Sequence, residues 1–305
     1  MAAKLVVSAA NSALGRVVLE RALLRPELEI VALVRSARAE AELPELPRGR
    51  ARALRVDYAD SAALHDACVG ATGLIHLAGI LIESRATRYQ EANVDTCRAL
   101  IDAVRASDVA KLVLVSAVGA DARSPNPFWR SKGEAEALVR ASGLPYTILR
   151  CPLVLGCRNA GVQAVAREIK TPVVPLPGGG VNLEQPIDAR DVADGALNAA
   201  LEIGCARDAT LDLVGPESLA LRDLVQRAAR LIGRSPWVVP VPIALVRKLL
   251  ALRTSLLGPG FSPDVIDVML ADARFDPTPA AKALGIELRP LDETLAHSLA
   301  LMDCA

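Results

Sequence analysis

The sequence predicts an α/β protein built on a doubly wound parallel sheet, with a smaller, mostly helical lobe in its second half. Three observations predict this fold. Strand-length apolar runs alternate with helical patterns through residues 1–151, the run 112–115 is apolar on both faces, and proline and glycine become frequent after residue 152. A strand that is apolar on both faces is buried between two layers of helices, as in a doubly wound sheet.

The elements of the first domain, residues 1–151, follow one another in a strand–helix rhythm. Strands are expected at 4–8, 29–35, 53–57, 73–77, 111–116 and 146–150. Helices are expected between them at 14–25, 61–69, 87–107 and 128–142. Each helix connects two parallel strands, and such crossovers are right-handed.

Residues 152–305 form the predicted lobe. Helices are expected at 161–169, 191–202, 218–232 and 243–250 and near the C-terminus. Residues 182–215, with a strand at 210–214, are expected to return to the sheet. Three glycines at 178–180 precede no helix, which indicates a surface turn rather than a phosphate loop.

Composition and charge exclude several classes of partner. Thirty-five Lys and Arg residues balance thirty-five Asp and Glu residues, so the chain has no net field that attracts nucleic acid. Three Phe, two Trp and three Tyr residues are too few for a base-stacking surface. We therefore expect small molecules or proteins as partners and no nucleic acid.

The cysteines and histidines indicate no metal site. The six cysteines are scattered, with neither a C-x-x-C pair nor a histidine at ligand spacing, which predicts buried thiols in a reducing compartment. His76 lies inside an apolar strand and is expected in the core, whereas His65 and His297 are expected on the surface. The N-terminus has no export signal and no apolar run is long enough to span a bilayer, so a cytoplasmic protein is expected.

The first strand, turn and helix carry the clearest motif. The turn at 8–16 reads SAANSALGR, and a helix that begins there offers free N–H groups to a pyrophosphate. The segment resembles the start of an atypical extended short-chain dehydrogenase/reductase, similar to the NAD-dependent epimerases and dehydratases. That family usually has glycines where this chain has Ala9, Ser12 and Gly15. Gly15 suits close helix–strand packing, Asn11 tolerates unusual dihedral angles, and Ser12 offers a hydroxyl to phosphate.

This resemblance implies a nicotinamide dinucleotide as cofactor. The cofactor-binding residues that it implies are Ala9, Asn11, Ser12, Ala13, Leu14, Gly15, Arg35, Asp57, Tyr58, Leu77, Ala78, Gly79, Ser116, Lys132 and Pro152. Arg35 follows the second strand, where members that prefer the phosphorylated cofactor have an arginine at the ribose 2′ position. NADP(H) is therefore expected over NAD(H), with Arg16 and Arg38 as helpers; a plain solvated arginine at 35 is the alternative. The two missing glycines imply weak binding.

The chemistry of the resembled family depends on a Ser or Thr after the fifth strand and on Tyr-x-x-x-Lys in the next helix. One helical turn brings the phenol and the ammonium side by side, which lowers the pKa of the phenol for proton transfer. Ser116 and Lys132 match as catalytic candidates, but Phe128 occupies the Tyr position. Tyrosines occur only at 58, 89 and 146, so none lies a turn before Lys132.

The resemblance covers nearly the whole chain. The segments GLPYTILRCP at 143–152 and QPIDARDVA at 185–193 have counterparts in the family, with Asp191 expected to cap the following helix. The chain is most similar to the branch that contains the nucleotide-binding accessory subunit of respiratory complex I. Residues 241–257 are apolar with three basic residues, and they are expected either to pack on the core with the cations outward or to rest on a membrane or a protein partner.

Three functions stay open from the sequence. The first is an NAD(P)(H)-binding protein, NADP-preferring, whose redox activity is weak, altered or absent because Phe128 lacks a proton to give. The second is an active oxidoreductase or isomerase on a small or isoprenoid-like substrate with a different proton donor. The third is a non-catalytic accessory or sensor protein. The substrate stays unknown.

Overall fold

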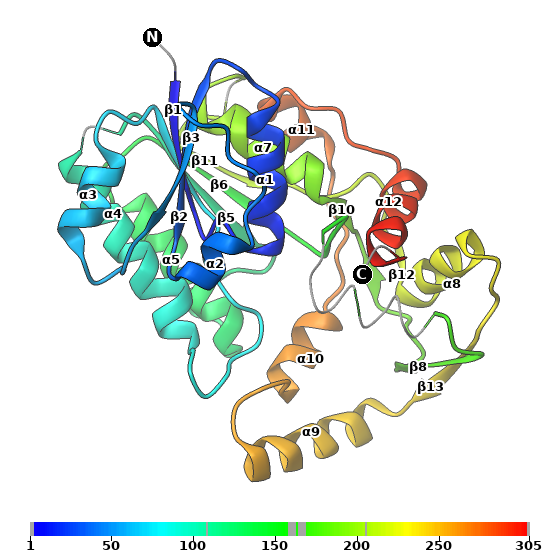
Figure 1. Cartoon of the computed structure of the whole chain (residues 1–305). Coiled ribbons are helices and arrows are strands. Elements are labelled where there is room, and N and C mark those ends of the chain that lie inside the picture. Colours follow the sequence, from blue (N-terminus) through cyan, green and yellow to red (C-terminus); the bar gives the residue numbers. More distant parts are fainter. Residues whose placement is uncertain (1–2, 108, 158–162, 164–168, 205, 304–305) are drawn as a thin grey trace.

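The predicted doubly wound sheet is confirmed by a computed structural model that describes residues 3–107, 109–157, 163, 169–204 and 206–303. Seven parallel strands lie in the order β11-β6-β5-β4-β1-β2-β3 (Figure 1). The strand order reverses between β1 and β4. In open α/β sheets, ligands bind at the carboxyl ends of the strands at this switch point.

The strands of the sheet begin and end within two residues of the expected ranges. They are β1 (Ala3–Ser8), β2 (Leu28–Val34), β3 (Ala51–Arg55), β4 (Gly73–His76), β5 (Leu112–Ala117), β6 (Tyr146–Cys151) and β11 (Ala209–Asp212). Their registers place Ser8 beside His76 and Ser116 beside Arg150.

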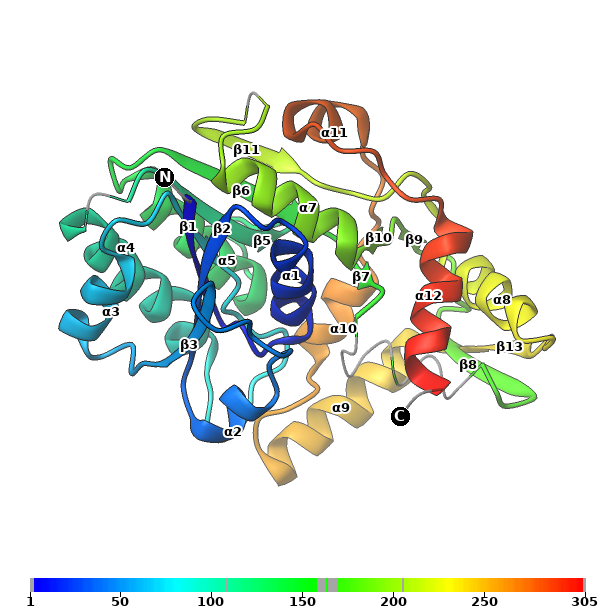
Figure 2. The same ribbon diagram turned by 45° about the horizontal axis from the view of Figure 1, so that its top comes forward.

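Helices cover both faces of the sheet (Figures 1 and 2). One layer holds α1 (Ala13–Leu23) and α7 (Ala189–Ala200). The other layer holds α3 (Ser61–Cys68), α4 (Thr96–Ala106) and α5 (Pro127–Arg140). Each layer has its own apolar core against the sheet. The single helix expected at 87–107 is instead a π-helical segment, Gln90–Asp95, followed by α4, and the short helix α2 (Ala37–Ala41) was not predicted.

The second half forms a lobe with a third apolar core. Three short strand pairs connect it: β7 (Val154–Leu155) with β10 (Ile187–Asp188), β9 (Leu183–Glu184) with β12 (Leu219–Ala220), and β8 (Val173–Pro177) with β13 (Trp237–Val241). Its helices are α8 (Leu221–Leu231), α9 (Ile243–Leu257), α10 (Pro263–Met269), α11 (Thr278–Leu284) and α12 (Leu291–Asp303). Most of the helix predicted at 161–169 lies outside the described residues.

Helix α9 departs most from the sequence expectation. It continues to Leu257 instead of ending near residue 250, and none of its residues is buried. The expectation that this helix packs on the core is therefore wrong, because it contacts mainly α10 and stands at the margin of the molecule (Figure 2). Among the described residues, no helix is both long and apolar enough to cross a membrane.

The cysteines and two of the histidines can be placed directly. The thiols of Cys68, Cys97 and Cys151 form no disulfide and are buried. Cys157 is also buried, and residues 205 and 304 lie outside the described part. His65 and His297 are half-buried rather than on the surface, because α3 and α12 turn them toward their neighbours. Within the described ranges, no group of three His, Cys, Asp or Glu side chains is arranged to hold a metal ion.

Candidate functional site

The turn after β1 keeps the shape of a phosphate-binding turn although it has lost two glycines. Ala9 adopts a left-handed backbone conformation with a φ of +50°, which L-residues other than glycine rarely adopt. A β-carbon on Gly15 would lie 2.5 Å from the carbonyl oxygen of Ala9 and 2.7 Å from that of Ala10. Gly15 is therefore required for the approach of α1 to β1, as the sequence predicted.

The start of α1 retains donors for an anion. Ser12 caps the helix by accepting a hydrogen bond of 3.0 Å from the amide of Gly15, which leaves the hydroxyl proton of Ser12 free to point elsewhere. Among the described residues, the amides of Ala13 and Leu14 have no hydrogen-bond acceptor. Two free N–H groups at the positive end of a helix dipole fit a pyrophosphate.

Asn11 has a different role from the one expected. The left-handed residue of the turn is Ala9, so the tolerance of Asn11 for unusual dihedral angles is not used. Instead its side-chain amide donates to Glu42 over 3.0 Å, and its carbonyl accepts from Arg16 over 3.2 Å. The hydrogen bond from Asn11, together with Arg38 and Arg16, holds the pKa of the Glu42 carboxyl below its usual range. Glu42 thus partly neutralises both of the expected helper arginines.

The ends of β2 and β3 hold the adenosine-side candidates. Arg35 is exposed and forms no hydrogen bond or ion pair with any described residue, so its guanidinium is available to a ligand. Asp57 is exposed and accepts from the amide of Ala59 over 3.0 Å. Burial raises the pKa of Tyr58, and hydrogen bonds with Ser8 and the backbone of Ala9 oppose that rise. Tyr58 thereby connects the β3 end with the turn after β1.

A buried histidine, His76, lies next to the switch point at the end of β4. His76 at the end of β4 is 1% exposed, and its Nδ1 lies 2.7 Å from the hydroxyl of Ser8. Burial, helped by the charge of Lys132, lowers the pKa of His76 to about 3, so the ring is neutral. His76 packs in the core as predicted. The hydroxyl of Ser8 also accepts the amide of Leu77 over 3.2 Å, which fixes the start of the small-residue turn after β4.

Lys132 reaches this turn from α5. A β-carbon on Gly79 would lie 3.3 Å from the Nζ of Lys132, and the Nζ donates to the carbonyl of Val115 over 3.0 Å. Burial lowers the pKa of the Lys132 ammonium. Asn93 also contacts the turn after β4, because its Oδ1 accepts a hydrogen bond from the amide of Ile80 over 2.8 Å. Asn93 was not among the predicted site residues. It could have been found as an asparagine on the buried side of a predicted helix, since a buried polar side chain needs hydrogen-bond partners.

Phe128 occupies the place one helical turn before Lys132, and its ring is buried. Its nearest aromatic neighbour is Tyr89, with ring centroids 6.0 Å apart in an edge-to-face arrangement. The phenol of Tyr89 donates to the carbonyl of Leu81 over 2.6 Å. Burial, followed by the charges of Glu83 and Asp264, raises the pKa of Tyr89 to about 12. Tyr89 therefore lacks the lowered pKa that a neighbouring ammonium gives the phenol of the resembled family.

Ser116 belongs to a buried ionic network. Its hydroxyl donates to the Oε1 of Glu136 over 2.7 Å, and Glu136 is fully buried. Arg150 binds both oxygens of Glu136 at 2.9 and 2.7 Å, and Arg140 binds Oε2 at 2.7 Å. Burial raises the pKa of Glu136, but these hydrogen bonds outweigh it and hold the pKa below its usual range. Because an ionised carboxylate only accepts, the hydroxyl proton of Ser116 is already committed.

This network was not predicted from the sequence. The feature that could have revealed it is Arg150, a charged residue in a mostly apolar strand, because a charged side chain in such a strand requires a charged partner when it is buried. The sequence alone did not identify Glu136 as that partner, because the two residues are brought together by the packing of α5 on β6.

The lobe side of the site includes one corrected residue. Pro152 follows β6 and is half-buried. The N-cap of α7 is Asp188, which accepts the amide of Arg190 over 2.8 Å, and not Asp191. Asp191 lies in the first turn and pairs with Arg289 before α12. The cap lies three residues earlier than expected, so Asp191 serves to dock the C-terminal segment.

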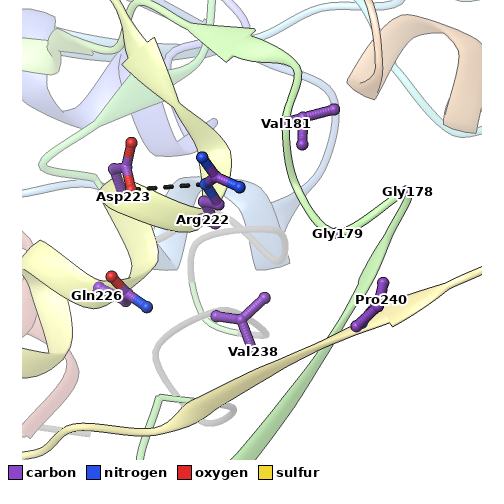
Figure 3. Close-up of a pocket in the computed structure, with 8 residues that line it drawn as sticks. All are labelled: Gly178, Gly179, Val181, Arg222, Asp223, Gln226, Val238 and Pro240. Atoms are coloured by element: carbon purple, nitrogen blue, oxygen red, sulfur yellow. Dashed lines mark ion pairs between the residues drawn. The ribbon is translucent and has the colours of Figure 1, made fainter.

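The glycines at 178–180 form a turn at the edge of the lobe, as predicted, with φ values of 60°, 75° and 64°. They border a shallow hollow of about 570 Å³ that lies between β8, β13 and α8, away from the switch point (Figure 3). The hollow is lined by Gly178, Gly179, Val181, Arg222, Asp223, Gln226, Val238 and Pro240. A second hollow of about 190 Å³ lies beside Lys111.

The geometry at the switch point agrees with a comparison against protein families. Residues 9–200 match a family model described as NAD(P)H-binding. The chain belongs to this NAD(P)H-binding family. The matched range includes the turn after β1, the β4 turn and Lys132, so the family model and the switch point coincide.

The names of two relatives of this NAD(P)H-binding protein describe a subunit and an assembly factor of larger complexes. It is 25% identical over 212 residues to the mitochondrial NADH dehydrogenase [ubiquinone] 1 alpha subcomplex subunit 9 of Arabidopsis thaliana, which covers 69% of this chain and 53% of the relative. It is 27% identical over 256 residues to the photosystem II assembly factor Ycf39 of Cyanophora paradoxa, covering 82% and 75%. The chain thus spans about half the length of the first relative.

Solved structures share the fold along nearly the whole chain. An NADPH-dependent quinone oxidoreductase from Escherichia coli, complexed with NADPH, superposes with a TM-score of 0.72 at 23% identity, covering 96% of this chain and 99% of that one. MoeE5 in complex with UDP-glucuronic acid and NAD gives 0.75 at 20% identity and covers 99% of each chain. At these identities the likeness concerns the fold, and one neighbour holds NADPH while the other holds NAD.

Proposed function

We propose that this chain binds NADP(H) at the switch point and serves as an accessory or sensor protein, without hydride transfer by the family's Tyr–Lys route. One observation carries the proposal: the ring one turn before Lys132 is the buried Phe128, which has no proton to give. The phenol nearest to it, Tyr89, donates to a backbone carbonyl and has a raised pKa. The names of the relatives, a complex subunit and an assembly factor, support an accessory role.

The residues that would hold the cofactor are those predicted from the sequence. The amides of Ala13 and Leu14, with the Ser12 hydroxyl, would bind the pyrophosphate. Arg35 would bind the 2′-phosphate through charge-assisted hydrogen bonds. The remaining proposed contacts are Ala9, Asn11 and Gly15 in the turn, Asp57 and Tyr58 at the adenosine, Leu77, Ala78 and Gly79 at the phosphates, and Ser116, Lys132 and Pro152 toward the nicotinamide.

The chemistry at the nicotinamide end follows from the side chains. NADPH supplies a hydride when bound, and reduction of a carbonyl also needs a proton for the developing alkoxide. The Nζ of Lys132 donates to the carbonyl of Val115 over 3.0 Å and would orient the ribose. Neither Phe128 nor Ser116 offers a proton, since the Ser116 hydroxyl donates to Glu136. Bound cofactor would therefore persist without being consumed, as a sensor of the nucleotide pool requires.

The Arg35→Ala variant tests the cofactor assignment. NADPH and NADH are titrated separately against the purified chain by calorimetry. We expect wild type to prefer NADPH, and Arg35→Ala to weaken NADPH binding by about 10- to 100-fold, the range of a charge-assisted hydrogen bond, with NADH unchanged. Arg98→Ala is the matched control, because Arg98 is an exposed arginine on α4 that is not among the proposed cofactor contacts. Binding of neither nucleotide, or an unchanged preference in Arg35→Ala, would refute the assignment.

The Phe128→Tyr variant tests the catalytic half of the proposal. Wild type with NADPH and a panel of aldehydes, ketones and quinones is expected to show no oxidation of the cofactor above the blank. A phenol one turn before Lys132 restores a general acid, a contribution of about 10²-fold or more. Turnover by wild type at a rate typical of reductases would overturn the accessory role. A Phe128→Tyr protein that binds NADPH but stays inactive would show that Ser116 must also be released from Glu136.

A further inference from the structure

Helix α9 presents a leucine stripe to solvent, which we define as Leu245, Leu249, Leu252 and Leu256. Their side chains are 49%, 57%, 56% and 72% exposed. The spacing of four, three and four residues places them within about 60° of one another on a helix of 3.6 residues per turn. Exposed leucines that gather on one face, unlike single scattered ones, mark an interaction surface.

The stripe points away from the protein. Three half-buried residues of α9, Ile243, Leu250 and Thr254, lie about 130–170° around the helix from the centre of the leucine stripe, and the half-buried Val246 lies about 90° from it. On this inner side Arg247 also binds Asp267 of α10. The helix is therefore fixed to α10 by one face, and among the described residues the leucine stripe on the opposite face has no partner. The ribbon views show α9 at the margin of the molecule with α10 beside it (Figures 1 and 2).

Cations flank the leucine stripe on both sides. Lys248 lies about 70° to one side of its centre and Arg253 about 70° to the other. Neither forms a hydrogen bond or an ion pair with any described residue, and α9 contains no acidic residue. A third cation, Arg85, donates to the carbonyl of Leu257 over 3.1 Å and adds positive charge at the end of the helix.

We propose that α9 lies on an anionic lipid bilayer, with the leucine stripe at the acyl boundary and Lys248 and Arg253 at the lipid phosphates. This arrangement has an apolar strip with cations on both flanks, which is what the surface of an anionic monolayer binds. A second copy of the chain is disfavoured, because pairing through the stripe would bring Lys248 and Arg253 against the same cations of its partner. The proposal does not depend on the proposed nucleotide function.

Vesicle flotation of the full chain tests this proposal. Two kinds of vesicle are used, phosphatidylcholine alone and phosphatidylcholine with 30% phosphatidylglycerol. We expect the chain to float with the anionic vesicles at least tenfold more than with the neutral ones, and to lose most of this binding in 0.5 M salt. No flotation with the anionic vesicles, or equal flotation with both, would overturn the proposal.

Three variants sharpen the test. Leu249→Ser with Leu252→Ser and, separately, Lys248→Glu should each reduce flotation with anionic vesicles by tenfold or more. Leu24→Ser is the matched control, because Leu24 is 69% exposed at the C-terminal end of α1, outside the leucine stripe, and should change nothing. Thermal unfolding and NADPH titration of each variant report that the fold is retained. If light scattering instead reveals a dimer that the double serine variant dissociates, a second copy covers the stripe and the lipid proposal fails.

Discussion

The turn after β1 and the first half of α5 have both lost residues typical of the resembled family, with different consequences. In the turn, Ala9 takes the left-handed conformation that glycine would supply, and Gly15 keeps α1 close to β1. In α5, Lys132 stands where the resemblance implies a lysine, but Phe128 stands where the resemblance implies a tyrosine. The surrounding packing can hold a backbone shape when a side chain changes, but packing cannot supply an exchangeable proton that the new side chain lacks. The turn after β1 therefore holds its shape without two glycines, whereas no side chain one turn before Lys132 carries an exchangeable proton.

The largest effect is expected in α5, from Glu136→Ala. The substitution removes the carboxylate from the half-buried guanidinium of Arg150 and leaves the buried hydroxyl of Ser116 without its acceptor. We expect a loss of about 3–4 kcal/mol of unfolding free energy, the lower part of the range for breaking a buried pair, because Arg150 is 26% exposed. Urea unfolding at pH 7 measures the loss. Glu134→Ala is the control, since Glu134 lies on the same helix without an ion pair in the described part of the chain. A loss below 1 kcal/mol would show that the network does not hold α5 to the sheet.

The same network predicts an acid dependence. The pKa of Glu136 is lower in the folded state than the ordinary value of 4.5, so its stabilisation is complete above pH 4.5 and is lost as the pH falls through the folded value. The difference in stability between wild type and Glu136→Ala should therefore narrow below pH 4. A difference that stays constant from pH 7 to pH 3.5 would contradict this sign.

The next largest effect is expected in the turn, from Gly15→Ala. The added β-carbon would meet two backbone oxygens at 2.5 and 2.7 Å, and neither can move without separating α1 from β1. We expect a loss of about 3 kcal/mol, the upper range for overpacking, and loss of NADPH binding. Glu20→Ala on the exposed side of α1 is the control in the same urea assay. An unchanged midpoint for Gly15→Ala would mean that the preserved shape of the turn is not enforced by packing.

The smallest effect is expected from Ala9→Gly. Glycine relieves the left-handed strain of about 1 kcal/mol but gains chain entropy when unfolded, so stability should change by less than about 0.5 kcal/mol. Removal of the methyl group opens the turn to phosphate, and NADPH should bind about three- to tenfold more tightly. Ala13→Gly, one residue into α1, should give no such gain. Weaker binding by Ala9→Gly would contradict the view that the alanine only imitates glycine.

Much of the fold followed from sequence patterns, since seven strands lie within two residues of their expected ranges. The expected site residues at the ends of β1 and β4 meet at the switch point because strand order alone brings them together. The strand pairs of the lobe and the helices α10 and α11 were not predicted. Four of the strands have only two residues and so no periodicity to detect, whereas β8 and β13 contain prolines, which are rare in strands. The helices α10 and α11 have seven residues each, too few for a clear helical pattern. Asp191 was misread as a cap, since the true start of α7 depends on the pairing of β10 with β7.

The sequence by itself determined the alternation of strands and helices, the position of Lys132 and the absence of a tyrosine one turn before it, because these depend only on residue order and helical spacing. Tertiary structure decided the rest. Glu136 became the partner of Ser116 and Arg150 only when α5 packed on the sheet. The leucine stripe of α9 became exposed because the neighbouring elements cover only the opposite face of that helix. An apolar pattern specifies which face can be buried, and only the arrangement of neighbouring elements decides whether it is.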